Sequence, residues 1–315
     1  MAQTSQNSAA DIAHKPMMST VQILLMNVGF FGIQYSFGMQ QNAMSPIYQF
    51  LGASADEIPI LNLAGPVTGL LIQPLIGALS DRTWSEKWGR RKPFFLIGAV
   101  GCSVFLFLMP FVTAVWMAVL CLWLLDVSNN TAMEPYRAFI GDRLPSKQLA
   151  KGFLAQSLFI GAGSALAAGT LVVLEKTLAG ATAAGIPYWV FGAFMVGSVC
   201  SIGSVLISVL STKELPPTPE GLVELERKKR EEGPFGFVKD IGVAIVEMPR
   251  GLKKMALVYL FQWYAMNVFW QYLGLMCAVT YFGVNLSDPG YAKTEAFNNA
   301  SGFATGLMVA YYVSC

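Results

Sequence analysis

Charged residues are scarce in this sequence. Only 13% of its 315 residues are Asp, Glu, Lys or Arg and 54% are hydrophobic, whereas soluble domains are about a quarter charged. Histidine occurs once, as His14, and the five cysteines are scattered singly through apolar stretches. These counts argue against a zinc site, a disulfide framework and histidine-based catalysis. We therefore expect no metal, no cofactor, no nucleic-acid partner and no enzymatic activity.

Long uncharged runs recur along the chain, at 17–46, 58–80, 93–125, 152–174, 177–212, 255–287 and 296–315. A hydrocarbon core about 30 Å thick takes about 20 residues of helix, and lipid forces the backbone to bond within helices. The run 93–125 contains Pro110, which predicts a hairpin between two helices, the second continuing to about Ile140. A loop at 177–185 precedes a helix that begins near Pro187. We expect an all-α polytopic membrane protein with seven or eight spans.

Basic residues fall in alternate loops. Nearly all of the 21 Lys and Arg residues lie before the first predicted helix, between the second and third helices, between the fourth and fifth, or between the sixth and seventh. Lys176 and Lys293 lie on the other side, and Arg137 lies inside a span. The positive-inside rule then places the N-terminus in the cytoplasm. The first apolar run is too long for a cleaved signal peptide, so we expect a multi-pass protein of the inner membrane.

The charged stretch after the sixth helix divides the chain. We expect a cytoplasmic tail at 1–16, a six-helix bundle at 17–211, a cytoplasmic central loop at 212–254, and the start of a second bundle at 255–315, with helix 7 and part of helix 8. The loop is interpreted as a solvated linker with a short charged helix, or as a regulatory docking site. A carrier of two six-helix halves divides at the same place, and such a carrier would be C-terminally truncated here.

The fourth helix carries charges inside the membrane, where charge usually faces a polar cavity or a partner. Asp126 and Arg137 are 11 residues apart, close to three turns, so they share a face about 16 Å apart. Asn130 and Glu134 lie between them, and Pro135 is expected to bend the helix and free a carbonyl. Either Asp126 takes up a proton or it belongs to a fixed structural ion pair. Glu134 either contributes to proton coupling or pairs with Arg137.

Two further helices carry amides that could bond a sugar. Asn27, Gln34 and Gln41 recur every seven residues on the first helix. Gln262, Asn267 and Gln271 lie among Trp and Tyr residues on the seventh. The alternatives are bonds between helices for the first set and anchoring of the helix at the membrane interface for the second.

The loop between the second and third helices is the most specific feature. Its Gly, Asp and Arg positions resemble the signature cytoplasmic loop of the major facilitator superfamily, with the longer spacer typical of sugar-cation symporters: Gly77, Asp81, Arg82, Gly89, Arg90 and Arg91. In that fold Asp81 could meet the basic cluster and a helix end, so that the loop acts as a cytoplasmic gate.

A narrower resemblance involves 64–77, the loop that follows, and the segment from Asp126 to Arg137. These stretches are similar to plant sucrose-proton symporters and their bacterial and animal relatives, within the wider glycoside-pentoside-hexuronide group, and we expect a bacterial homologue. The resemblance implies that Asp126 is the proton site and that Arg137 binds sugar or couples it to the proton. Two features depart from the plant pattern: Glu134 replaces a small residue, and the loop after the first helix has no histidine.

The resulting hypothesis is a secondary active transporter, a monomer in the bilayer, that takes up a disaccharide such as sucrose or maltose together with a proton. Three alternatives stay open. One is an efflux or other-solute carrier of the same fold, another is coupling to sodium, and the third is an inactive fragment.

Overall fold

The computed structural model describes residues 15–183, 185–232, 236–288 and 290–314. Most of the expected N-terminal tail, including His14, lies outside the described residues. So do residues 233–235 of the expected central loop, and Cys315.

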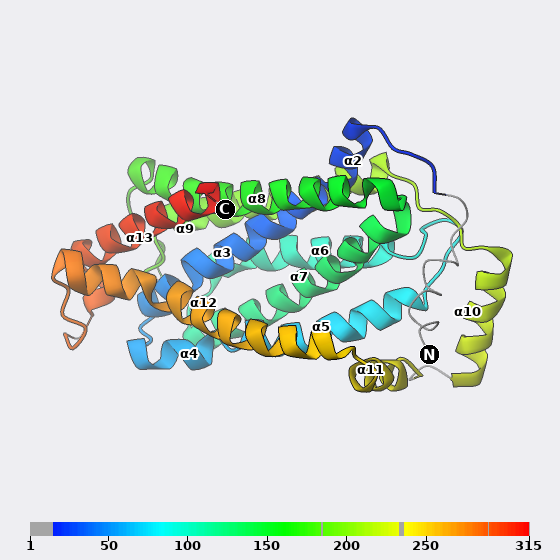
Figure 1. Cartoon of the computed structure of the whole chain (residues 1–315). Helices are drawn as coiled ribbons and strands as arrows, with labels where there is room; N and C mark the ends of the chain where they lie inside the picture. Colours follow the sequence, from blue (N-terminus) through cyan, green and yellow to red (C-terminus); the bar gives the residue numbers. More distant parts are fainter. Residues whose placement is uncertain (1–14, 184, 233–235, 289, 315) are drawn as a thin grey trace.

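Helices account for most of the described chain, which confirms the predicted all-α class (Figure 1). The α-helices are α2 (Thr20–Asn27), α3 (Gly29–Phe50), α4 (Ile58–Leu61), α5 (Ala64–Asp81), α6 (Lys92–Leu108), α7 (Val115–Arg143), α8 (Leu149–Thr177), α9 (Tyr188–Ser211), α10 (Pro219–Glu232), α11 (Gly236–Val246), α12 (Arg250–Phe282) and α13 (Glu295–Ser314).

The long helices up to α9 form one bundle. In it α3 packs against α7, α8 and α9, α6 packs against α7 and α9, and α5 lies along α7 (Figure 1). Apolar lipid gives helices little hydrophobic reason to associate, so close packing matters more. Gly98 shows this at the interface of α6 and α7, because a Cβ there would lie 2.6 Å from the backbone nitrogen of Ala132.

The first membrane helix is broken at Val28, between α2 and α3. Tyr136 of α7 fills the break, since its hydroxyl bonds to the Met26 carbonyl and accepts a hydrogen bond from the Gly29 amide at 3.1 Å. Ser208 of α9 donates to the same Met26 carbonyl at 2.5 Å. Backbone groups that the break leaves unpaired are thus bonded by side chains of two other helices.

Several predicted boundaries agree with the structure. The turn at Pro110 is a 3-10 segment, Met109–Phe111, and α9 begins one residue after Pro187. The fourth membrane helix, α7, ends at Arg143 rather than near Ile140, and it runs through Pro135 without interruption.

In the described part of the chain, five helical segments are long and apolar enough to cross a membrane: Ala55–Asp81, Lys92–Phe111, Val115–Arg143, Ser146–Thr177 and Tyr188–Ser211. The sequence predicted seven or eight spans. The difference comes from α3, α12 and α13, which are long enough but too polar to be counted by the same measure. Amides such as Gln34, Gln41 and Gln271 lower their mean hydropathy.

The expected central loop is more structured than a linker with one short helix. Besides the charged α10, it contains the apolar α11, which packs against α5. The next long helix, α12, begins at Arg250, about one turn before the domain boundary predicted between 254 and 255. α12 and α13 pack together, and α13 lies along α8.

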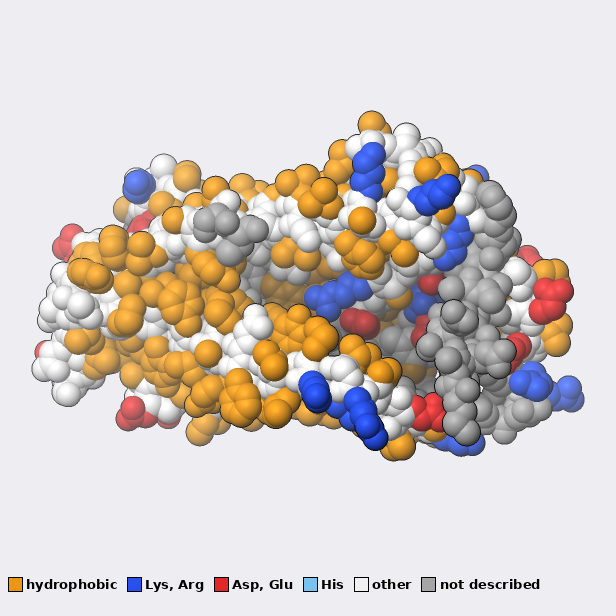
Figure 2. Space-filling model, viewed as in Figure 1, with side chains coloured by type: hydrophobic (Ala, Val, Ile, Leu, Met, Phe, Trp, Pro, Cys, Tyr) orange, Lys and Arg blue, Asp and Glu red, His pale blue; other side chains and the backbone are white. Residues whose placement is uncertain are grey.

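Basic side chains gather at one end of the molecule. Figure 1 places α10, α11 and the connection from α5 to α6 at this end, and Figure 2 shows Lys and Arg concentrated there. We call it the charged end. The name covers three segments: residues 80–92, residues 142–143 at the end of α7, and residues 212–214 after α9.

Candidate functional site

A buried carboxyl group lies in the middle of α7. The Asp126 residue is 2% exposed, and its Oδ2 atom is hydrogen-bonded to the Thr68 hydroxyl of α5. The same oxygen accepts a hydrogen bond from the Asn130 amide at 3.0 Å, one turn along α7. Both of these groups are neutral.

The orientation of Asn130 is fixed from the neighbouring helix. Gln73 of α5 donates from Nε2 to Asn130 Oδ1 at 2.7 Å. The amide nitrogen of Asn130 therefore points toward Asp126, where it also donates to the backbone carbonyl of Asp126 at 2.8 Å. We call Thr68, Gln73, Asp126 and Asn130 the carboxyl cluster.

The charges predicted to act with Asp126 lie further along α7. Arg137 Nη1 lies 3.8 Å from Glu134 Oε2, and their side chains are 45% and 35% exposed. The structure thus pairs Arg137 with Glu134 and leaves Asp126 among neutral groups. Figure 2 shows a hollow between α8 and α12, with basic and acidic side chains on its floor.

The charged end is organised around Arg91, whose side chain is only 5% exposed. Its guanidinium contacts Asp81 Oδ1 at 2.5 Å and Asp142 Oδ2 at 2.8 Å, and it donates to the Ser80 hydroxyl at 2.5 Å. Burial opposes the charge on Arg91, but the attraction of Asp142 and then Asp81 outweighs it and raises the pKa of Arg91 above its ordinary value. One side chain therefore ties the end of α5 to the end of α7.

The start of α6 is capped by Glu214, which follows α9. Its carboxylate accepts three backbone N–H bonds, from Arg90 at 2.7 Å, Arg91 at 2.9 Å and Lys92 at 2.8 Å. Free N–H groups and the helix dipole make a helix start a favourable place for an anion. Gly89 permits this contact, because it has φ +78° and a Cβ there would lie 2.4 Å from the Glu214 carboxyl carbon.

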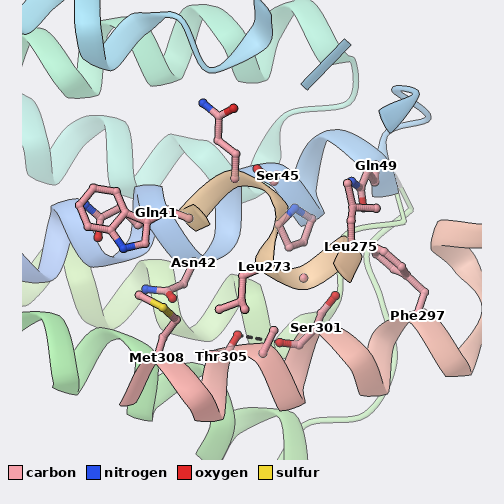
Figure 3. A pocket seen from close by; sticks show the side chains of 15 residues that line it. Gln41, Asn42, Ser45, Gln49, Leu273, Leu275, Phe297, Ser301, Thr305 and Met308 are labelled. Carbon is pink, nitrogen blue, oxygen red and sulfur yellow. Dashed lines mark hydrogen bonds between the residues drawn. The ribbon is translucent and has the colours of Figure 1, made fainter. Parts of the chain in front are cut away.

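A second polar site lies where α3, α12 and α13 meet (Figure 3). It is a cavity of about 40 Å³ that includes Gln41 and Gln271 in its lining. Gln49 Oε1, Trp270 Nε1 and Ser301 Oγ are buried there without a hydrogen-bond partner among the described residues. The space suffices for a few water molecules, whereas ligand pockets usually measure about 300 Å³ or more. In this conformation it is too small to enclose a sugar.

The other predicted residues lie apart from these sites. Asn27 is buried and donates to the Ile23 carbonyl of its own helix at 2.8 Å. Gln34 is half-buried on α3, Gln262 is exposed on α12, and Asn267 donates to the Trp263 carbonyl at 3.0 Å. The predicted stripe of Asn27, Gln34 and Gln41 is thus divided by the break at Val28.

Within the predicted gate motif, Gly77 faces Glu134 of α7, whose Cγ would lie 3.7 Å from a Cβ at that position. Arg82 follows the last residue of α5 and Arg90 precedes Arg91. Among the residues that the structure describes, no group of three or more His, Cys, Asp or Glu could hold a metal ion.

Several residues of these sites were not predicted from the sequence, among them Thr68, Gln73, Asp142 and Glu214. Thr68 and Gln73 are polar residues in a largely apolar span, which was a usable signal. Glu214 had a weaker one, an acidic residue directly after a span and before two prolines.

Comparison with known proteins gives a consistent set of similarities. The family model of the Major Facilitator Superfamily matches residues 26–314. A sucrose transport protein of Arabidopsis thaliana is 30% identical over 188 residues, which cover 53% of this chain and 36% of that protein. The general alpha-glucoside permease of Schizosaccharomyces pombe is 25% identical over 298 residues, covering 85% and 49%. The chain thus spans half or less of these curated relatives.

Two solved structures match the chain over most of its length, at low identity. One is a bacterial homologue of the human lysosomal transporter Spinster in an inward-facing, unoccupied conformation. It is 15% identical with a TM-score of 0.47, and the match covers 96% of this chain and 80% of that one. The other is the xylose transporter XylE of E. coli in an inward-open conformation, 13% identical with a TM-score of 0.47, covering 91% and 80%.

Proposed function

The chain belongs to the Major Facilitator Superfamily, and on this premise we propose that it serves the proton-coupled uptake of a disaccharide across the cytoplasmic membrane. Its N-terminus would lie in the cytoplasm and the charged end would face the same side, because basic loops are retained there. We propose a monomer as the working unit.

The observation that carries the proposal is the environment of Asp126. A carboxylate buried away from water is costly unless a cation or a proton neutralises its charge. Thr68 and Asn130 supply hydrogen bonds but no charge. Uptake of a proton removes the cost, and a group that gains from protonation in one conformation can drive a conformational change when the proton leaves.

We assign Arg137, which lies beside Glu134, to the sugar. Both are partly exposed and lie on the same helix as Asp126, so a ligand that contacts them is coupled to the proton site through α7. A guanidinium can donate several hydrogen bonds to sugar hydroxyls. Glu134 either contributes to proton coupling or holds Arg137 in place.

A disaccharide is proposed because curated relatives carry the names sucrose transport protein and general alpha-glucoside permease. Gln41 of α3 and Gln271 of α12 both line the small cavity, and Trp270 of α12 also contributes. Separation of α12 from α3 would enlarge this cavity and expose amides and an aromatic ring to a sugar. Such a movement is what alternating access between two bundles requires.

The test measures binding and proton movement separately. Binding of radiolabelled sucrose and maltose to the purified chain in nanodiscs tests the sugar, with an unrelated polyol as the control. Alkalinisation of a weakly buffered suspension of expressing cells after sugar addition tests the proton, with Asp126→Asn as the matched variant. We expect saturable disaccharide binding, and sugar-induced alkalinisation that the variant lacks.

Two results would overturn parts of this proposal. A folded chain that binds neither disaccharide points to a carrier of another solute on the same fold. If the Asp126→Asn variant still takes up sugar together with protons, Asp126 is not the proton site.

A further inference from the structure

The Thr68 hydroxyl has more acceptors around it than it has protons. It lies within hydrogen-bond distance of Asp126 Oδ2, of the Ala64 carbonyl at 2.9 Å and of the Gly65 carbonyl at 3.4 Å. The Asn130 amide donates to it at 3.3 Å. A hydroxyl carries one proton to donate and two lone pairs, so Thr68 cannot donate to Asp126 and to Ala64 at the same time.

The protonation state of Asp126 decides where that proton goes. An ionised Asp126 can only accept, so the Thr68 proton must point to it and leave the Ala64 carbonyl. A protonated Asp126 can donate to the Thr68 oxygen, which frees the Thr68 proton for the Ala64 carbonyl. The second arrangement is a one-way chain of hydrogen bonds from Asp126 to Thr68 to Ala64.

We propose that Thr68 is a positioning residue that relays the protonation of Asp126 to the backbone of α5. This inference rests on the proposed function. A proton from the medium binds Asp126 Oδ2, and the Thr68 hydroxyl rotates so that its own proton moves from Asp126 to the Ala64 carbonyl. No other covalent bond forms or breaks. Loss of the proton to the medium reverses the rotation.

Among the groups around Asp126, Thr68 is the one whose hydrogen bond can change direction when Asp126 gains a proton. Gln73 holds Asn130 with its donor side toward Asp126 in either state. Gln40 of α3 also lies near Asp126 and is neutral. The Cys102 thiol of α6 also lies near Asp126, and it is hydrogen-bonded at 2.9 Å to Asn129. On α7 itself, the charged Glu134 and Arg137 lie two and three turns away.

The switch acts on the first turn of α5. Threonine bonds to a carbonyl four residues earlier are known to bend helices, so the two states of Thr68 favour different geometries at the start of α5. The same helix ends at Asp81, which contacts Arg91 at the charged end. The relay therefore lies on α5, one of the two helices that join the carboxyl cluster to the proposed gate.

Infrared spectroscopy of the chain in nanodiscs tests the relay without requiring transport. The carbonyl stretch of a protonated Asp126 is identified as the band that Asp126→Asn removes, recorded across a range of pH. Thr68→Val has nearly the same shape as threonine but cannot accept a hydrogen bond. We expect it to shift the Asp126 band to higher frequency, while Thr68→Ser keeps the frequency of the native chain.

Other results would overturn the relay. It falls if Thr68→Val leaves the band in place, or if Asp126→Asn removes no band at any pH. Should Thr68→Val not fold, Thr68→Ala, which also lacks the hydroxyl, replaces it in the same measurement with the same expected shift. Disaccharide binding measured in the same nanodiscs separates the two proposals. If the chain binds sugar but Thr68→Val leaves the Asp126 band unchanged, only the relay is rejected. If Thr68→Val shifts the band but the chain binds no disaccharide, only the sugar assignment is rejected.

Discussion

The carboxyl cluster and the charged end both contain carboxyl groups, but they surround them with different partners. At the charged end, Asp81 and Asp142 face the Arg91 guanidinium and Glu214 faces three backbone N–H groups of a helix start. In the middle of α7, Asp126 has hydrogen bonds only from neutral side chains. α5 and α7 contribute to both regions, so the difference comes from the partners and not from the helices.

This difference separates a fixed contact from a titratable one. A carboxylate paired with a buried cation is stabilised in its charged form. Removal of either partner leaves the other charge buried and uncompensated. A buried carboxyl without a cation can change its charge with little loss of packing. The charged end is therefore expected to govern stability, and the carboxyl cluster to govern response to protons. Four substitutions test this division, in order of decreasing effect on the free energy of unfolding.

Arg91→Ala should have the largest effect. It removes the cation between Asp81 and Asp142 and leaves both carboxylates without it, which we expect to cost about 3 kcal/mol. Equilibrium unfolding in mixed micelles measures the change. Arg90→Ala is the matched control and should cost about 1 kcal/mol or less, because the backbone N–H of residue 90 still bonds Glu214. Equal losses in the two variants would contradict the central place of Arg91.

Glu214→Ala should come next, at about 2 kcal/mol, because it leaves three N–H groups at the start of α6 without their charged acceptor. Glu214→Gln retains an acceptor oxygen without the charge and should lose roughly half as much. The same unfolding measurement applies. If the two variants lose the same amount, the charge at the helix start contributes nothing.

Gly89→Ala should destabilise the native chain more than it destabilises Glu214→Ala. In the native chain the added Cβ meets both a positive φ and the Glu214 carboxyl group, whereas the second background retains only the unfavourable φ. A double-mutant cycle should therefore give a coupling of about 1 kcal/mol. A coupling near zero would show that Glu214 moves aside at no cost.

Asp126→Asn should have the smallest effect, within about 1 kcal/mol of the native chain, since it is nearly isosteric and no cation loses a partner. Asp142→Asn is the same substitution at the charged end. It should cost about 2 kcal/mol, because it removes the carboxylate charge with which Arg91 interacts most strongly. Reversal of this order in unfolding measurements would break the comparison between the two regions.

The sequence predicted the parts of this arrangement that depend on local composition. Uncharged runs located α6, α8 and α9, and Pro110 marked the hairpin before α7, since lipid permits few alternatives to a helix. The pairing of side chains was not predictable in the same way. Thr68 lies 58 residues from Asp126 and Glu214 lies 124 residues from Arg90, so their contacts depend on how helices pack.

The interior of α7 shows the same limit. The spacing of Asp126 and Arg137 placed both on one face, but spacing could not show that Arg137 pairs with Glu134 while Asp126 turns to α5. The break at Val28 was missed as well, because it is stabilised by hydroxyl groups from α7 and α9 and has no proline of its own.

That break has a consequence for how the protein is made. Tyr136 and Ser208 follow Met26 by 110 and 182 residues, so the ribosome completes α2 and α3 long before it adds the side chains that bond the groups between them. During insertion the first helix must find temporary partners for a carbonyl and an amide, in water or in the insertion machinery. Only after α9 is synthesised can Ser208 bond the Met26 carbonyl at the break between α2 and α3.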